Sequence, residues 1–120
     1  MPGRTVPLIT DEYYHVYNRG ANKIPIFLQK RDYVRAVELI RFYSYKNPPL
    51  RFSKYLKLSL ERKQNFMDDL VGHERLVDVI CYCLMPNHFH LLLKQVADNG
   101  ISIFLSNYQN SYTRYFNTKI

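Results

Sequence analysis

Cysteines, sequence repeats and long apolar runs are scarce or absent in this sequence of 120 residues. Its two cysteines, Cys81 and Cys83, stand two positions apart in an extended run, which is too far for an easy disulfide. We expect reduced thiols packed in the core, and metal ligation is the alternative. No stretch approaches the roughly 20 apolar residues that a membrane-spanning helix needs, and residues 1–10 hold no sustained apolar run. These absences favour one cytoplasmic domain, residues 1–120, with no membrane partner.

The charge of the chain favours a polyanionic partner. Its formal net charge is +7, and 47% of its residues are apolar, which is enough for one compact core. Each phosphate that lysine or arginine neutralises releases condensed counterions. Nucleic acid is therefore the first candidate partner and an anionic membrane surface the second, while a basic but otherwise ordinary soluble protein is the alternative.

The first half of the chain predicts one strand followed by helices. Residues 13–19 (YYHVYNR) are aromatic and β-branched and stop at a glycine, which predicts a strand. Apolar residues at three- and four-residue steps predict a helix over residues 31–46, ended by Asn47-Pro48-Pro49. Residues 50–60 are ambiguous. A second helix is predicted from Ser59, a suitable N-cap, to Gly72.

The second half predicts a hairpin and a final helix. Residues 76–84 are apolar on nearly both sides, which is typical of a central strand. The turn at residues 85–87 is short enough to form only a hairpin, so residues 88–95 predict an antiparallel strand. The last segment predicts an amphipathic helix whose apolar side holds Ile101, Phe104, Leu105, Tyr108, Tyr112 and Phe116. The whole order indicates an α+β fold: an antiparallel sheet with helices packed on it.

His88-Phe89-His90 is the sharpest chemical feature of the sequence. In a strand, residues two apart lie on the same face, so the two imidazoles would be close enough to share a metal ion. One further ligand would leave positions open for water or a phosphate oxygen. His15 could approach the ion from the neighbouring strand, although a histidine hydrogen-bonded within the sheet is the simpler reading. A histidine pair of this spacing is weak support by itself.

Three sequence blocks add to the histidine pair. They are residues 14–20 (YHVYNRG), 82–93 (YCLMPNHFHLLL) and 111–117 (SYTRYFN), which spread over nearly the whole chain. Together they resemble the REP-associated tyrosine transposases and their insertion-sequence-200-like relatives, the single-tyrosine HUH transposases. The resemblance implies a ferredoxin-like, RRM-like HUH endonuclease fold. It also implies that His88 and His90 bind Mg²⁺ or Mn²⁺ beneath the scissile phosphate of single-stranded or hairpin DNA.

The activity that the resemblance implies is DNA transposition. A tyrosine attacks the phosphate, forms a 5′-phosphotyrosine link and frees a 3′-hydroxyl, so the strand is later rejoined without a nucleotide cofactor. In the family this tyrosine and a further metal ligand lie beyond the helix that matches here. We therefore expect a C-terminally truncated, incomplete fold whose own catalysis is uncertain, with Tyr112 and Tyr115 as weak substitute nucleophiles.

Several polar residues are candidates for contacts with DNA. The candidates are Asn18, Arg19, Lys23 and Arg114, with tyrosines available to stack on unpaired bases. A solvated basic surface is the alternative for each residue taken singly. A homodimer is a further expectation. The alternative function is a non-catalytic module, derived from a transposase, that binds single-stranded nucleic acid and uses no metal.

Overall fold

The fold is built on a three-stranded antiparallel sheet. It is taken from a computed structural model that describes residues 7–19 and 25–118. The strands are β1 (Tyr13–Arg19), β2 (Val77–Met85) and β3 (His88–Gln95), and their order is β1-β3-β2, so that β3 is central. The predicted first strand and the predicted second strand of the hairpin are both confirmed with their bounds.

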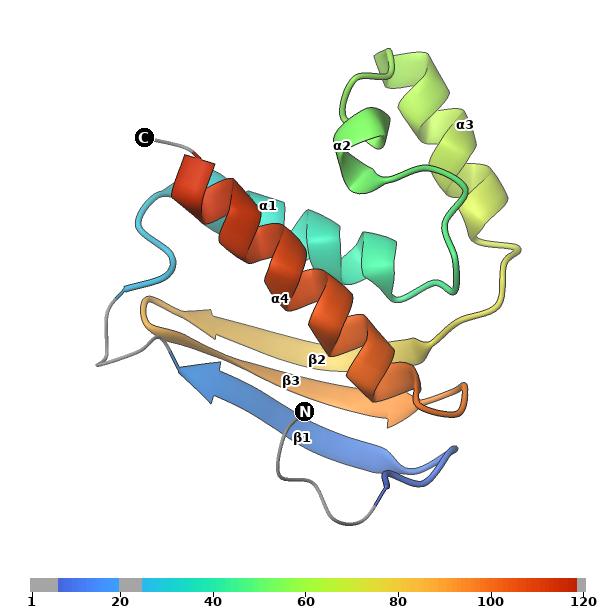
Figure 1. Cartoon of the computed structure of the whole chain (residues 1–120), viewed down its shortest axis with the longest axis vertical. Coiled ribbons are helices and arrows are strands. Elements are labelled where there is room, and N and C mark those ends of the chain that lie inside the picture. Colours follow the sequence, from blue (N-terminus) through green and yellow to red (C-terminus); the bar gives the residue numbers. More distant parts are fainter. Residues whose placement is uncertain (1–6, 20–24, 119–120) are drawn as a thin grey trace.

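Two long helices cover one face of this sheet (Figure 1). They are α1 (Lys30–Tyr43) and α4 (Gly100–Thr118). The short α2 (Phe52–Tyr55) and α3 (Leu60–Leu70) extend beyond one end of this layer. Among the described residues, no helix is both long and apolar enough to cross a membrane. The predicted α+β class, with helices packed on an antiparallel sheet, is confirmed.

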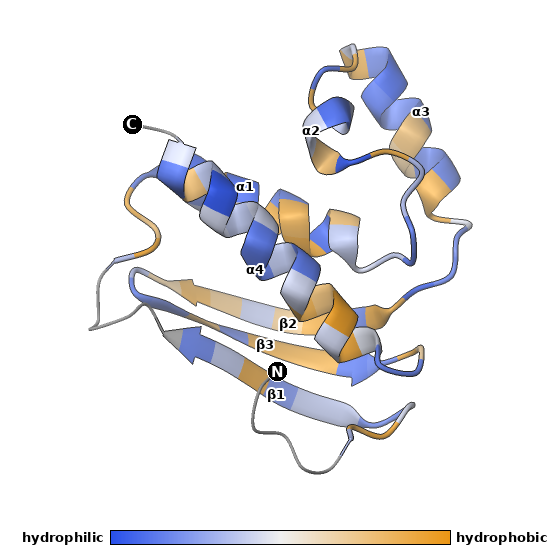
Figure 2. Cartoon of the chain, in the orientation of Figure 1, coloured by the Kyte–Doolittle hydropathy of each residue, from blue (hydrophilic) through white to orange (hydrophobic). Residues whose placement is uncertain are grey.

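Buried and partly buried residues alternate along β3, so the two faces of the sheet differ in burial. Every second residue from Phe89 to Gln95 is buried against the helices, and the residues between them are only partly buried. The core fills the space between the sheet and the helices. In Figure 2 the strands β2 and β3 and the first turns of α4 are the most apolar parts of this layer. Its largest fully buried side chains include Tyr108, Phe42, Phe104, Leu39 and Leu91.

Strand β2 differs from its prediction as a central, doubly buried strand. It lies at an edge of the sheet, and a bulge between Val79 and Cys81 shifts its register against β3. Beyond the bulge, Cys81, Tyr82 and Cys83 are exposed. The cysteines are free thiols, as expected, but their predicted place in the core is wrong, because no helix covers this part of the strand's open face.

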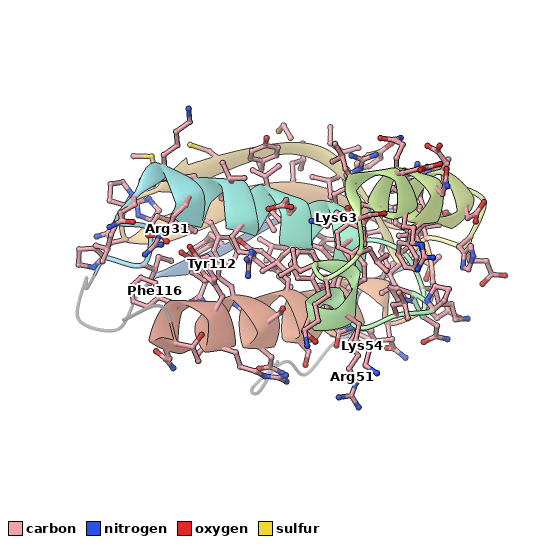
Figure 3. The ribbon with its side chains drawn as sticks, turned by 90° about the horizontal axis from the view of Figure 1, so that it is seen from above. Arg31, Arg51, Lys54, Lys63, Tyr112 and Phe116 are labelled. Atoms are coloured by element: carbon pink, nitrogen blue, oxygen red, sulfur yellow. The ribbon has the colours of Figure 1, made fainter. Side chains whose placement is uncertain are left out.

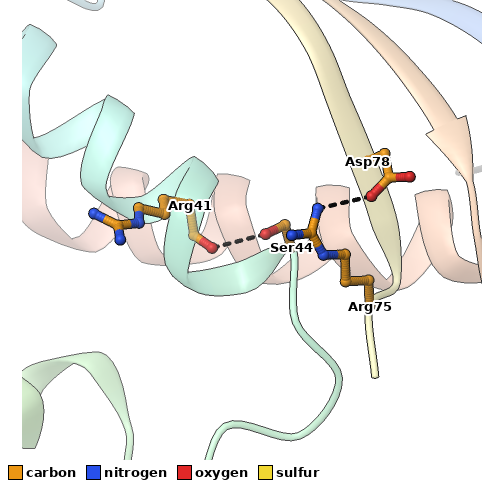
Figure 4. A network of polar contacts seen from close by, with 4 residues as sticks. All are labelled: Arg41, Ser44, Arg75 and Asp78. Atoms are coloured by element: carbon orange, nitrogen blue, oxygen red, sulfur yellow. Dashed lines mark hydrogen bonds and ion pairs between the residues drawn. The ribbon is translucent and has the colours of Figure 1, made fainter. Parts of the chain in front are cut away.

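Helix α1 ends at Tyr43, three residues before its predicted end. Ser44 caps it by donating a hydrogen bond from Oγ to the carbonyl oxygen of Arg41 at 2.7 Å (Figure 4). The chain then turns into an isolated bridge between Tyr45 and Arg75. Val34 is one of the apolar residues whose spacing predicted this helix, but it is 50% exposed and does not lie on the buried side.

The segments that follow α1 and precede β2 are fixed by short polar contacts. Arg75 donates to Asp78 at 2.8 Å (Figure 4). Its guanidinium also lies over the ring of Tyr45. The backbone N–H of Leu76 donates to the carbonyl of Ser44 at 2.7 Å. Thus the end of α1 is joined directly to the start of β2, and α2 and α3 lie on a loop between these two points. Ser59 caps α3 as predicted, accepting from the N–H of Arg62.

Gly100 allows α4 to start directly against the sheet, and it gives a test of the fold. A Cβ atom at this position would lie 2.1 Å from the carbonyl oxygen of Leu76 and 2.9 Å from its carbonyl carbon. Backbone atoms cannot yield as a flexible side chain does, so Gly100→Ala should lower the free energy of unfolding by at least about 2 kcal/mol. We expect this loss of stability although alanine has a higher intrinsic helix propensity than glycine. The measurement is urea denaturation.

The matched control is Gly72→Ala, where the nearest atom to an added Cβ is 3.5 Å away, an ordinary contact. Its urea midpoint should stay close to that of the parent protein. Equal midpoints for the two variants would contradict the close approach of α4 to Leu76.

Candidate functional site

Three histidines meet on the sheet face that the helices do not cover. His88 and His90 lie on β3 and alternate with the buried Phe89, and their ring centroids are 5.0 Å apart. His15 lies on β1, which pairs with β3 in antiparallel register. Its Nε2 is 2.9 Å from Nδ1 of His90, and the two rings are within 10° of parallel. The two-residue spacing, which in the sequence favoured a shared metal ion, therefore brings His88 and His90 together.

Hydrogen bonds at Nδ1 orient the two histidines of β3. Nδ1 of His88 lies 2.6 Å from Oδ1 of Asn87. An amide oxygen only accepts, so His88 donates from Nδ1, and in the neutral form of the ring Nε2 then carries a lone pair. If His90 likewise donates from Nδ1 to His15, its Nε2 also carries a lone pair. Metal-binding histidines are commonly held in this way, with one nitrogen bonded to a partner and the other facing the ion.

The described residues can hold a metal ion only at a site where some of its coordination positions are left to other ligands. In the ranges 7–19 and 25–118, no three histidine, cysteine, aspartate or glutamate side chains gather closely enough to hold an ion. His88 and His90 would supply two imidazole nitrogens, and the remaining positions would fall to water, phosphate oxygens or groups outside these ranges. Open positions are what a catalytic metal ion needs, whereas a structural ion is usually fully ligated by protein.

Aromatic side chains of β1 extend the open face beyond the histidines. Tyr13 and Tyr17 are 58% and 59% exposed. The ring of Tyr17 lies 5.4 Å from that of His15 and 5.9 Å from that of His90, and Nζ of Lys94 lies 5.9 Å from the ring centroid of Tyr13. This row of rings was not predicted from the sequence. Its signal was the alternation of Tyr13, His15 and Tyr17 within one predicted strand.

Of the predicted DNA-binding residues, Asn18 and Arg114 have described side chains, and both lie away from the histidines. Asn18 lines a hollow of about 220 Å³ on the helix side of the sheet, together with Gln109 and Thr113. Arg114 lines a larger cleft in the helix layer. The backbone of Arg19 pairs opposite His88, but its side chain is outside the described part of the chain, and so is Lys23.

The two substitute tyrosines lie in the helix layer, on the opposite side of the sheet from the histidines. Tyr112 stands between α1 and α4 and is 7% exposed, and its hydroxyl donates to the carbonyl of Ile26 at 2.5 Å (Figure 3). Burial, with a smaller effect of the Asp32 carboxylate, raises the pKa of Tyr112 well above its usual range. A raised pKa disfavours the phenolate that would attack a phosphate.

Tyr115 is also engaged in the helix layer. Its hydroxyl donates to Oδ1 of the buried Asp32 at 2.7 Å, and burial together with this hydrogen bond raises the pKa of Tyr115. Oδ2 of Asp32 accepts from the N–H groups of Leu28 and Gln29 at the start of α1. Tyr112 and Tyr115 therefore join α4 to α1, and the geometry gives both a structural role.

Comparisons with known proteins identify no relative of this chain. No protein-family model matches it, and neither the curated proteins nor the solved structures contain a match. Its function therefore has to be argued from its own residues.

The structural role of Tyr112 can be tested by removing its hydroxyl. Tyr112→Phe should lower the free energy of unfolding by about 1–2 kcal/mol, because the carbonyl of Ile26 loses its buried donor. The exposed Tyr17 provides the control, since Tyr17→Phe should leave the urea midpoint unchanged. A Tyr112→Phe protein with unchanged stability would show that the contact between α4 and residue 26 contributes nothing.

Proposed function

We propose that this chain is a DNA-binding domain of the single-tyrosine HUH transposase type, which holds a divalent metal ion on His88 and His90 above single-stranded DNA. The observation that carries the proposal is the pairing of these imidazoles on the uncovered sheet face, each with Nδ1 hydrogen-bonded. The strand order β1-β3-β2, with helices after β1 and β3, is also compatible with a ferredoxin-like β-α-β-β-α-β arrangement.

The metal ion, Mg²⁺ or Mn²⁺, would polarise a phosphate oxygen and offset the charge that develops there. The chain's own residues position it: His88 and His90 provide nitrogen ligands, while Asn87 and His15 hold their rings in place. Phe89 lies between the two histidines and is 3% exposed, packed in the core, so the strand cannot rotate without exposing it. This anchoring keeps the two ligands on a rigid element.

The exposed rings of β1 favour an unpaired strand as the DNA substrate. Tyr17 adjoins His90, and Tyr13 lies further along the same strand with Lys94 near its ring. Bases of single-stranded DNA stack on such rings, and each stacked base contributes about 1–3 kcal/mol. The proposed strand runs along β1, with its bases on Tyr13 and Tyr17 and a phosphate at the histidine pair.

We assign none of the described tyrosines as the nucleophile of transposition. Tyr112 and Tyr115 are hydrogen-bonded in the helix layer. In this proposal Tyr13 and Tyr17 on the open face stack on bases, the described residues bind the metal ion and the DNA, and the nicking step needs another tyrosine.

A second candidate function is a single-strand binding module that uses no metal. The row of Tyr13, His15 and Tyr17 favours it, because stacking needs exposed rings and no ion. In that case His15 and His90 would serve as a hydrogen-bonded pair within the stacking surface.

Isothermal titration with Mn²⁺ separates the two functions. His88→Ala and His90→Ala should each weaken Mn²⁺ binding by more than about a hundredfold, since loss of an outer partner alone costs about ten- to a hundredfold. Asn87→Ala should fall in that smaller range, because it removes only the hydrogen-bond partner of His88.

The matched control is His73→Ala, which removes an exposed histidine beyond α3 and should leave the titration unchanged. A parent protein that binds single-stranded DNA but takes up no Mn²⁺ would support the module without metal. Equal Mn²⁺ affinity of the parent and the His88→Ala and His90→Ala variants would refute the proposed site.

A further inference from the structure

The helix layer contains a second basic surface, on the other side of the sheet from the histidines. A cleft of about 530 Å³ lies where α1, α2 and the later turns of α4 meet. It receives one arginine from each of three segments: Arg35 from α1, Arg51 just before α2, and Arg114 from α4. Figure 3 views this layer from above and shows Arg51 and Lys54 projecting beside α4.

The lining of this cleft matches a phosphate group. Two serine side chains, Ser53 and Ser111, accompany the arginines, and no acidic side chain lines the cleft in the described parts of the chain. The ion pairs found within those parts are Lys46–Glu74 and Arg75–Asp78, so no carboxylate neutralises Arg51 or Arg114. Guanidinium groups bind phosphate oxygens through two parallel N–H donors.

Aromatic contacts hold one of these arginines in place. The guanidinium of Arg35 lies 4.4 Å from the ring centroid of Tyr115 and 5.4 Å from that of Phe52. Tyr115 is itself fixed by its hydrogen bond to the buried Asp32. A stacked guanidinium loses less conformational entropy when it binds a ligand than a mobile lysine does. This part of the cleft is therefore organised before any anion arrives.

The cleft continues into a second basic hollow, which argues for a long anion. Arg35 and Tyr115 also line a neighbouring hollow of about 580 Å³, which adds Lys30 and Arg31 from α1 and includes one acidic residue, Glu38. The two hollows share these two side chains and together form a basic track across α1 and α4. A single small anion would fill only a part of it.

We propose that this track, from Lys30 and Arg31 through Arg35 to Arg51 and Arg114, binds backbone phosphates of a nucleic acid. It lies on the face away from His88 and His90, so it contacts a different segment of the same DNA from the one on the open face. The proposal rests on the proposed function only in naming the polyanion as nucleic acid. It also gives Arg114 a place in DNA binding that is separate from the metal site.

The test is the salt dependence of DNA binding by Arg51→Gln/Arg114→Gln. The probe is a fluorescein-labelled DNA hairpin with a single-stranded tail, followed by anisotropy over a series of salt concentrations. We expect at least a tenfold loss of affinity at low salt. The slope of log K against log salt should fall by about 2, since each lost phosphate contact lowers it by about 1.

The matched control is Lys57→Gln/Arg62→Gln, which removes the same charge from exposed positions outside the track. Affinities and slopes that are equal in the two double variants would overturn the proposal, because net charge alone would then explain binding. Equal displacement of the probe by inorganic tripolyphosphate at matched phosphate concentration would also overturn it, in favour of a small-anion site. Mn²⁺ titration of the same variant should be unchanged, which keeps this test distinct from that of the metal site.

Discussion

The alternation of side chains along β3 is the constraint on which the rest of this molecule depends. Phe89, Leu91 and Leu93 point into the core, so His88 and His90 must point to the opposite face. Burial of a large apolar side chain contributes about 1.5–3 kcal/mol, and a slip of one residue would reverse every side chain of the strand. The register that stabilises the core is thus the same register that brings the histidines together. β1 adds His15 and Tyr17 to that face through its antiparallel pairing with β3.

This arrangement separates two kinds of surface. The open face carries imidazoles and exposed aromatic rings, which suit a metal ion and unpaired bases. The helix layer carries guanidinium groups, which suit phosphates. Tyr112 and Tyr115 belong to the helix layer, because their hydroxyl groups join α4 to residue 26 and to Asp32. The net charge of +7 is compatible with contacts on both sides of the sheet.

Local patterns predicted most of the fold. The aromatic and β-branched run that stops at a glycine predicted β1, and the short turn before His88 predicted β3. The apolar stripe of α4 predicted the burial of Ile101, Phe104 and Tyr108. The bulge in β2 was not predictable, because an uninterrupted apolar run does not reveal a register shift. The cysteines were misplaced for a related reason: an apolar edge strand and an apolar central strand have the same sequence pattern.

The candidate site was predictable only in part. The spacing of His88 and His90 placed both on one face, but the contact of His90 with His15 depends on which strand lies beside β3. The basic cleft could not be predicted, since Arg35, Arg51 and Arg114 are far apart in sequence and meet through helix packing. Such long-range contacts leave no periodic signal in the sequence.

The most direct measurement of the central claim is an anomalous difference map from crystals of this chain soaked in Mn²⁺. We expect a peak on the open sheet face, bonded to an imidazole nitrogen of His88 and to one of His90. Soaked crystals with no peak there, or with Mn²⁺ held by residues away from this pair, would contradict it.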